Sequence, residues 1–103
     1  MEVYKVKDIE LYLNKKKRVL FLYFYEDWCH SLTEIIDSFF RNKYDLNKMY
    51  IKVKVSQSKQ IIDKLDIETY PIIKVYKCQQ LYSQIHCNSN SILQNLESIY
   101  NIV

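Results

Sequence analysis

Two hydrophobic patterns in the first half of the chain predict its central elements. Residues 19–25, VLFLYFY, form an almost unbroken run of β-favouring side chains, which is typical of a strand buried on both faces of a sheet. The apolar residues that follow are spaced three or four positions apart: Leu32, Ile35, Ile36, Phe39 and Phe40. This spacing predicts an amphipathic helix at about residues 29–43 that covers the strand.

The flanking segments carry weaker patterns. An imperfect apolar spacing predicts a first helix at about residues 6–15, with a short strand at residues 3–4 before it. Residues 50–55 alternate between apolar side chains and lysines, so one face of this strand should be solvated or lie near a sheet edge. A short helix should follow, with Ser56 or Ser58 as its N-cap residue.

The C-terminal third predicts two antiparallel strands and a helix. The segment YPIIKVYK predicts a strand that begins at Pro71, because the first position of a strand is one of the few in a sheet that tolerate proline. Residues 81–85 should return antiparallel across a turn at Gln79 and Gln80, and a helix from about residue 90 should follow. The order of elements predicts an α/β fold in three layers, with a mixed sheet of four or five strands and a C-terminal antiparallel hairpin.

Composition and charge narrow the class of protein. The 103 residues are 49% hydrophobic and 26% charged, which is typical of one globular domain covering residues 1–103. The formal net charge of +3 comes from lysines spread along the chain, and the one basic run, Lys15–Arg18, falls at a predicted helix-to-strand junction. We therefore expect a solvated loop there and no binding of nucleic acid.

The same features set the expected location and assembly. The longest apolar run is far shorter than the roughly 18 residues that span a bilayer, and the charged N-terminal segment does not resemble a signal peptide. Three cysteines at irregular spacing indicate free thiols rather than a disulfide framework. We expect a cytoplasmic protein that binds no membrane, metal or cofactor and exists as a monomer or weak dimer.

Cys29 has the most distinctive chemistry, because it stands between the predicted central strand and the helix after it. A thiol at a helix N-terminus lies near unsatisfied backbone N–H groups and the positive end of the helix dipole, and both favour the thiolate. A protonated His30 would favour it further, whereas Glu26 and Asp27 would oppose it. We expect an accessible Cys29 thiol with a lowered pKa; the alternative is a small buried hydrophobic residue.

Two segments resemble the thioredoxin family, and the resemblance extends over essentially the whole chain. In FYEDWCHSL a strand ends and Trp-Cys opens a helix, and in IETYPIIKVYK a proline opens a later strand, as in that family. The resemblance implies a thioredoxin-like fold with Cys29 as the catalytic thiol. It also implies a substrate-binding surface of Trp28, His30, Tyr70 and Pro71, with a cis bond between the last two. Without the Trp-Cys segment, a trans proline that starts an edge strand would be the preferred interpretation.

The chain departs from the thioredoxin family at the residues that serve the second half-reaction of dithiol exchange. The second cysteine of the family, three residues after the first, corresponds to Leu32, so the usual intramolecular disulfide cannot form. Tyr23 occupies the position where many thioredoxins keep a buried carboxylate, and Lys52 corresponds to the lysine beside that carboxylate. The first half-reaction, in which the Cys29 thiolate attacks a disulfide, remains chemically feasible.

The two remaining cysteines lie near the ends of the predicted hairpin. With the turn placed as above, Cys87 lies opposite Ile72 and beside Pro71, which makes it a candidate resolving or partner-contacting residue. The alternative for Cys87 is a partly buried thiol in a strand-to-helix loop. Cys78 is expected beside the turn, too far from Cys87 to form a disulfide. His86 next to Cys87 does not make a zinc site without a second pair of ligands.

Two functions of different classes remain open. In the first, the protein is an atypical monothiol redox protein in which Cys29 forms mixed disulfides with protein thiols, protein disulfides or glutathione. In the second, it is a non-catalytic binding or adaptor module that holds partners in the groove around Trp28, Tyr70 and Pro71. A standard dithiol reductase is excluded, because Leu32 cannot act as the second thiol. The intact Trp-Cys and proline segments favour the first function.

Overall fold

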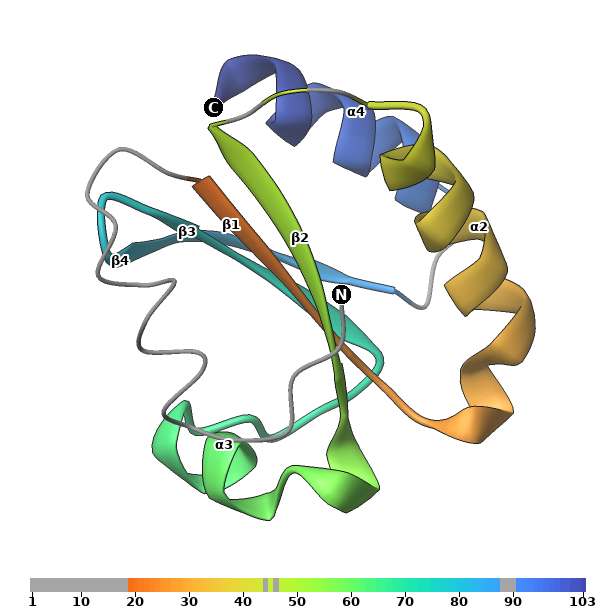
Figure 1. Ribbon diagram of the computed structural model, residues 1–103, viewed down its shortest axis with the longest axis vertical. Coiled ribbons are helices and arrows are strands. Elements are labelled where there is room, and N and C mark those ends of the chain that lie inside the picture. Colours follow the sequence, from red (N-terminus) through yellow and green to blue (C-terminus); the bar gives the residue numbers. More distant parts are fainter. Residues whose placement is uncertain (1–18, 44, 46, 88–90) are drawn as a thin grey trace.

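The computed structural model describes residues 19–43, 45, 47–87 and 91–103 (Figure 1). The first helix and strand predicted at residues 3–15 and the basic run Lys15–Arg18 lie outside the described residues. The elements are β1 (Val19–Tyr25), the 3-10 helix η1 (Asp27–Cys29), α2 (His30–Arg41), β2 (Lys48–Lys54), the 3-10 helix η2 (Val55–Gln57), α3 (Lys59–Lys64), β3 (Ile72–Lys77), β4 (Gln80–His86) and α4 (Ile92–Ile102).

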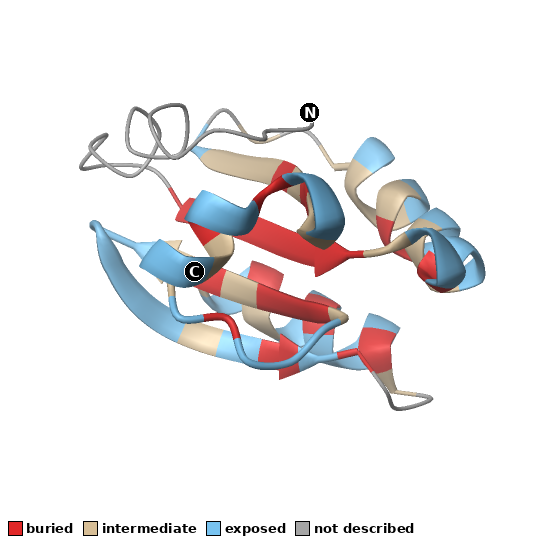
Figure 2. Cartoon of the chain, turned by 90° about the horizontal axis from the view of Figure 1, so that it is seen from below, coloured by how far each residue is buried: buried red, intermediate tan, exposed pale blue. Residues whose placement is uncertain are grey.

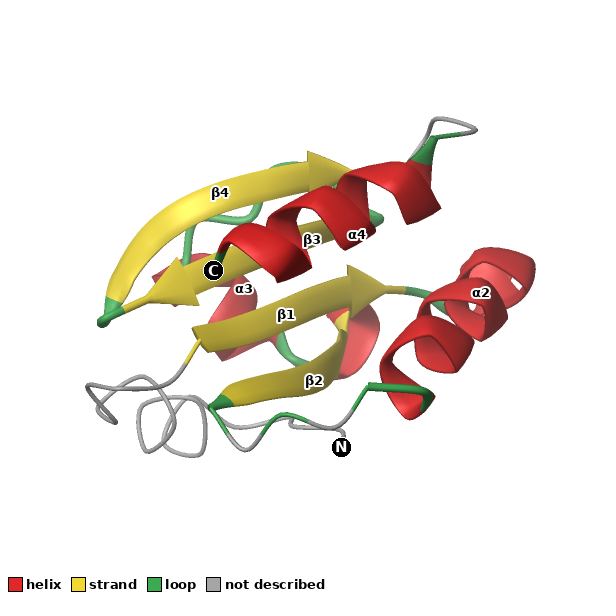
Figure 3. Ribbon diagram, turned by 90° about the horizontal axis from the view of Figure 1, so that it is seen from above, coloured by secondary structure: helices red, strands yellow, loops and turns green. Residues whose placement is uncertain are grey.

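The described strands form one mixed sheet in the order β2-β1-β3-β4. β1 pairs in parallel with β2 and antiparallel with β3, and β3 pairs antiparallel with β4. Helices α2 and α4 lie on one face of this sheet and α3 lies on the other (Figure 3). The structure therefore confirms the predicted three-layer α/β fold and its C-terminal hairpin.

Strand β1 is the centre of the protein because both of its faces are covered. All seven of its residues are buried (Figure 2). Phe21 and Tyr23 pack among the side chains of α2 and α4, whereas Leu22 and Phe24 pack against the α3 side. Complete burial of such a side chain contributes roughly 1.5–3 kcal/mol, so this run fixes the sheet within the fold.

The buried apolar stripes of helices α2 and α4 are narrower than the sequence predicts. Ile36 and Leu96 are fully buried between the sheet and the two helices. Ile35 and Leu93, which the apolar spacing places on the buried stripes, are instead 43% and 48% exposed. They lie at the border between α2 and α4 and line an open groove there, so the two helices do not close over them.

The hairpin turn lies one residue earlier than predicted. Lys77 pairs with Gln80, so the turn residues are Cys78 and Gln79 rather than Gln79 and Gln80. Both turn residues have positive φ, 53° and 69°, as expected for a two-residue turn that matches the twist of the strands. Glycine and asparagine normally favour this backbone, and neither occupies the turn, so its position has no signal in the residues.

The register of the hairpin also differs from the prediction. An irregularity between Val75 and Tyr76 shifts the pairing, so that Ile72 faces His86. Cys87 therefore lies opposite Pro71, one residue away from its predicted partner, and its N–H donates to the Pro71 carbonyl at 3.3 Å. The end of β4 is thereby fixed beside the loop that leads into β3.

The loop before Pro71 begins with a hydrogen-bonded helix end. After α3, the N–H of Ile67 donates to the Ile62 carbonyl at 3.0 Å and the N–H of Asp66 to the Asp63 carbonyl at 3.4 Å. This pattern normally places glycine at the Asp66 position, since the backbone there is left-handed, and here Asp66 has φ 54°. The helix end directs the chain across the sheet toward Tyr70 and Pro71.

Candidate functional site

Cys29 lies at the junction between the end of β1 and the start of α2. Glu26 leaves the strand in an extended conformation, and its carbonyl accepts the N–H of Cys29 at 2.9 Å, which closes the single turn of η1. Cys29 is then the residue immediately before the first residue of α2. The predicted position of the thiol at the start of a helix is confirmed.

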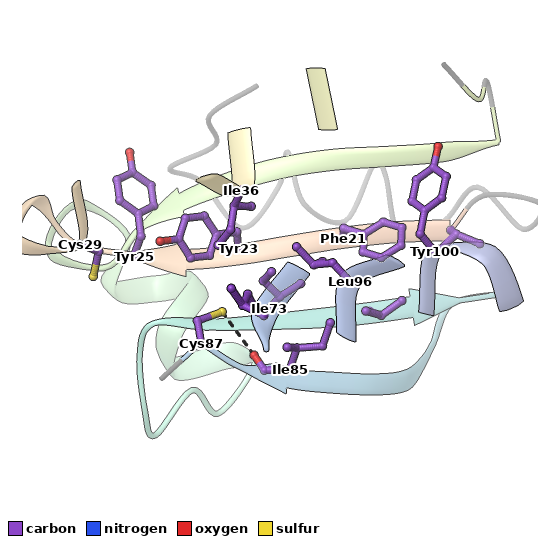
Figure 4. Packing of buried hydrophobic residues seen from close by; sticks show 13 residues of the cluster. Phe21, Tyr23, Tyr25, Cys29, Ile36, Ile73, Ile85, Cys87, Leu96 and Tyr100 are labelled. Carbon is purple, nitrogen blue, oxygen red and sulfur yellow. Dashed lines mark hydrogen bonds between the residues drawn. The ribbon is translucent and has the colours of Figure 1, made fainter. Parts of the chain in front are cut away.

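The prediction that Cys29 is accessible is wrong. Only 4% of the residue is exposed, and it belongs to the core cluster between the sheet and helices α2 and α4. Figure 4 shows Cys29, Tyr25 and Cys87 at the same end of this cluster. The core cluster that includes Cys29 also contains residues distant in sequence, such as Cys87 and Leu96, so the local strand-to-helix pattern could not predict this burial.

The aromatic residues predicted to bind substrate meet at the surface. Trp28 is 69% exposed and Tyr70 is 42% exposed, and their ring centroids are 6.1 Å apart. The peptide bond between Tyr70 and Pro71 is cis. The structure thus brings Trp28, Tyr70 and Pro71 together at the turn that carries Cys29.

His30 pairs with Glu34 and not with the Cys29 thiolate, which its sequence position suggested as a partner. Its Nε2 lies 3.4 Å from a carboxylate oxygen of Glu34, one helical turn later, and both side chains are largely exposed. An exposed pair of this kind contributes little to stability. His30 therefore lies on the outer surface of α2.

Cys87 is a buried thiol next to the proline. The residue is 6% exposed, and its Sγ donates a hydrogen bond to the Ile85 carbonyl at 3.5 Å (Figure 4). Burial raises the pKa of the Cys87 thiol to about 12; a backbone hydrogen bond from Ile73 opposes this rise, and the negative charge of the Cys29 thiolate adds to it. A thiol that keeps its proton at neutral pH is a poor nucleophile, so the geometry favours a structural rather than a resolving role.

The interior neighbours of Cys29 are apolar or firmly protonated. Tyr23 is fully buried, and its hydroxyl shares a 2.9 Å hydrogen bond with Thr33 Oγ1. Burial raises the pKa of the Tyr23 phenol far above its ordinary value, so this hydroxyl cannot act as a base near neutral pH. Leu32 packs against the same core cluster as a partly buried hydrocarbon. Neither Tyr23 nor Leu32 could therefore take a proton from a second thiol.

Lys52 has a different partner from the one that its sequence position suggested. Its Nζ donates to Asp37 Oδ2 on α2 at 3.1 Å and lies 5.7 Å from the centre of the Tyr25 ring. Asp37 also accepts a 2.7 Å hydrogen bond from the hydroxyl of Tyr50. Sequence reasoning missed Asp37, because only the parallel pairing of β1 and β2 brings this helical carboxylate to β2.

The two acidic residues before Trp28 turn away from the thiol. Glu26 accepts hydrogen bonds from the backbone N–H of Ser56 at 2.8 Å and from its hydroxyl at 3.1 Å. Asp27 forms a 2.8 Å ion pair with Lys54. From their sequence positions, both carboxylates are expected to oppose the Cys29 thiolate. Their partners lie about 30 residues further along the chain, so local sequence does not reveal them.

The described residues offer free thiols but no metal site. Within residues 19–43, 45, 47–87 and 91–103, no group of three histidine, cysteine or acidic side chains could hold a metal ion. All three cysteines are free, so no described disulfide links the site to another element. None of the described helices is long and apolar enough to cross a membrane. The site can therefore supply a thiol and an aromatic surface.

Comparison with known proteins agrees with this geometry. The structure is similar to a Schistosoma mansoni thioredoxin at a TM-score of 0.78 and 21% identity, covering 100% of this chain and 94% of that one. It is also similar to a Plasmodium falciparum thioredoxin at a TM-score of 0.77 and 21% identity, covering 96% and 97%. No curated protein matches the chain significantly. A sequence model of the thioredoxin family matches residues 2–98, and the chain therefore belongs to the thioredoxin family.

Proposed function

We propose that this protein is a thioredoxin-like redox protein that works through a single thiol, Cys29. In the proposed reaction, the Cys29 thiolate attacks one sulfur of a partner disulfide. A new sulfur–sulfur bond joins Cys29 to the partner, and the other partner sulfur leaves as a thiolate. The observation that carries this proposal is the place of Cys29, at the start of α2 and directly after the exposed Trp28.

The partner in this proposal binds on the aromatic surface. Trp28 and Tyr70 are large side chains with exposed rings, which commonly act as anchors in protein interfaces. Pro71 lies directly after Tyr70 and is held at its carbonyl by Cys87. A peptide segment of a protein disulfide, extended across these residues, would present its sulfur to Cys29.

The mixed disulfide in this proposal is long-lived, because nothing in the described residues is suited to break it. Leu32 is a hydrocarbon, and Cys87 keeps its proton at neutral pH. Release needs an outside thiol such as glutathione. Its thiolate attacks the partner sulfur, joins the partner and leaves Cys29 as a thiolate, so that bonds and electrons balance.

A second candidate function is a binding module that uses the same surface without redox chemistry. The burial of Cys29 favours it, since the residue is only 4% exposed while Trp28 beside it is 69% exposed. In this case the aromatic pair and Pro71 would hold an extended segment of a partner, and the sulfur would serve only as core packing.

A peptide disulfide with thionitrobenzoate as leaving group distinguishes the two candidates. The Cys78→Ser variant is the reference, because Cys78 is exposed and would react on its own. Under the redox proposal the reference releases coloured thionitrobenzoate and gains the mass of the peptide, and the additional change Cys29→Ser abolishes both signals. Persistence of the adduct without Cys29, or its absence from the reference, would reject the proposal.

The binding candidate has its own readout in the same proteins. Trp28 is the only tryptophan of the chain, so its fluorescence reports on the aromatic surface. A peptide with serine in place of the reactive cysteine should change this fluorescence equally with and without Cys29→Ser. Binding that persists while no adduct ever forms would establish the binding module instead.

A further inference from the structure

Glu26 links the turn that carries Cys29 to a distant part of the chain. Its two carboxylate oxygens accept the N–H and the hydroxyl of Ser56 at 2.8 and 3.1 Å, so both oxygens are bound by one residue of η2. The carbonyl of Glu26 accepts the N–H of Cys29 at 2.9 Å. A single residue thus fastens the Cys29 turn to the segment that follows β2.

The neighbouring ion pair strengthens this connection only slightly. Asp27 contacts Lys54 at 2.8 Å, but the Asp27 side chain is 84% exposed, and exposed ion pairs contribute little. The bonds of Glu26 are different, because its carboxylate accepts two hydrogen bonds from one residue and Glu26 as a whole is half-buried, although both bonds lie at the exposed surface. Hydrogen bonds to an ionised carboxylate are stronger than those between neutral groups.

We infer that the paired hydrogen bonds between Glu26 and Ser56 act as a latch that holds the η1 turn, and Cys29 within it, in the buried position, which makes Glu26 a positioning residue. Cys29 is the last residue of η1 and only 4% of it is exposed, so movement of this turn would bring the residue out of the core. Movement of the turn requires Glu26 to leave Ser56, because the same residue holds the N–H of Cys29. The latch sets how often the thiol is available; its use in redox chemistry rests on the proposed function.

The three cysteines of the chain allow a direct test by alkylation with iodoacetamide, followed by peptide mapping. Cys78 is exposed and reports the intrinsic reaction rate, whereas Cys87 is 6% exposed and reports opening of the rest of the core. In Glu26→Ala the Cys29 rate should rise about tenfold, because both bonds of the latch are lost. The rates at Cys78 and Cys87 should not change.

Conservative and matched variants separate the latch from general destabilisation. Glu26→Gln retains an oxygen for the Ser56 N–H and gains an amide donor for its hydroxyl, so it should return the Cys29 rate to within about twofold of wild type. Ser56→Ala removes one of the two bonds and should raise the rate about threefold. Glu97→Ala is the matched control, because Glu97 lies on α4, away from the Cys29 turn, and pairs there with Lys43.

The outcomes decide the inference without reference to the redox proposal. A Cys29 rate that is unchanged in Glu26→Ala, or that rises in parallel with the rate at Cys87, would overturn the latch. An increase in Glu26→Gln as large as in Glu26→Ala would also overturn it, since the hydrogen bonds would then be irrelevant. Faster alkylation of Cys29 without any peptide adduct would leave the latch in place and remove only the redox function.

Discussion

The two sides of Cys29 differ in what they retain of thioredoxin chemistry. On the outer side, Trp28 and Tyr70 are exposed and adjacent, and the cis bond to Pro71 is present. On the inner side, a fully buried tyrosine and a leucine stand where the resemblance places a carboxylate and a second thiol. The outer side is suited to bind a partner and to let Cys29 attack its disulfide, whereas the inner side is suited only to pack within the core.

This difference shows that the two halves of disulfide exchange depend on separate physical requirements. Capture of a partner needs a surface and one sulfur, both of which are compatible with a closed apolar core. Release within the same molecule needs a second nucleophile and a group that accepts its proton, and both must be accommodated inside that core. The Tyr23 hydroxyl shares a hydrogen bond with Thr33 and keeps its proton, so the core gains stability where a dithiol protein keeps reactive groups.

The largest expected effect comes from restoring a second thiol on the inner side. In Leu32→Cys, two thiols stand three residues apart at the start of α2, and the second can attack a mixed disulfide on Cys29. In the Cys78→Ser background, we expect the peptide adduct to disappear within the time in which the Cys78→Ser reference accumulates it, measured by intact mass. Leu32→Ser is the control, since it removes the leucine without adding a thiol; an adduct equally persistent in both variants would contradict the prediction.

On the outer side, removal of the exposed indole should weaken binding without affecting the fold. Trp28→Ala in a Cys29→Ser background should reduce affinity for the serine-substituted peptide by about 30-fold, corresponding to about 2 kcal/mol for an aromatic anchor. Calorimetry measures the affinity, and urea unfolding should show nearly unchanged stability because Trp28 is 69% exposed. Equal affinity in both proteins would remove Trp28 from the binding surface.

Local patterns predicted the elements of the fold well. The seven apolar residues of Val19–Tyr25 form β1 with the predicted bounds, and the spacing of apolar residues gave α2 to within two residues at each end. Such patterns succeed because burial on one or both faces is decided by neighbours along the chain. The positions of Trp28, Tyr70 and Pro71 followed from the family resemblance.

Features that depend on contacts between distant segments could not be predicted. The burial of Cys29 depends on packing by residues as remote as Cys87, and the latch joins Glu26 to Ser56. The hairpin register depended on a turn without glycine and on an irregularity opposite Tyr76, neither of which has a sequence signal here. Lys52 stands at the predicted position but pairs with Asp37, because Tyr23 occupies the position of the expected carboxylate.

The buried Cys87 thiol should be visible in the pH dependence of stability. The folded state keeps the Cys87 proton up to a pKa of about 12, whereas the unfolded thiol loses it near its ordinary value of 9.0. The unfolded state therefore binds fewer protons above pH 9, and stability falls as pH rises, with a limiting slope of about 1.4 kcal/mol per pH unit.

Comparison with Cys87→Ala isolates this contribution from that of the buried tyrosines, whose pKa values are also raised. Urea unfolding of both proteins between pH 8 and about 11 should show a steeper decline for wild type. Parallel curves would mean that Cys87 is solvated enough to titrate normally, which would return it to consideration as a resolving thiol.

The smallest effect is expected from the inner hydrogen bond itself. Tyr23→Phe leaves the Thr33 hydroxyl without its partner at a part-buried position and should cost about 1 kcal/mol of unfolding free energy. Thr33→Val should cost a similar amount, and the double variant less than the sum, because neither polar group is then left unpaired. Peptide affinity at Trp28 should be the same in all three proteins. A loss of affinity in Tyr23→Phe would show that the two sides of Cys29 are coupled, and that the interior contributes to binding as well as to packing.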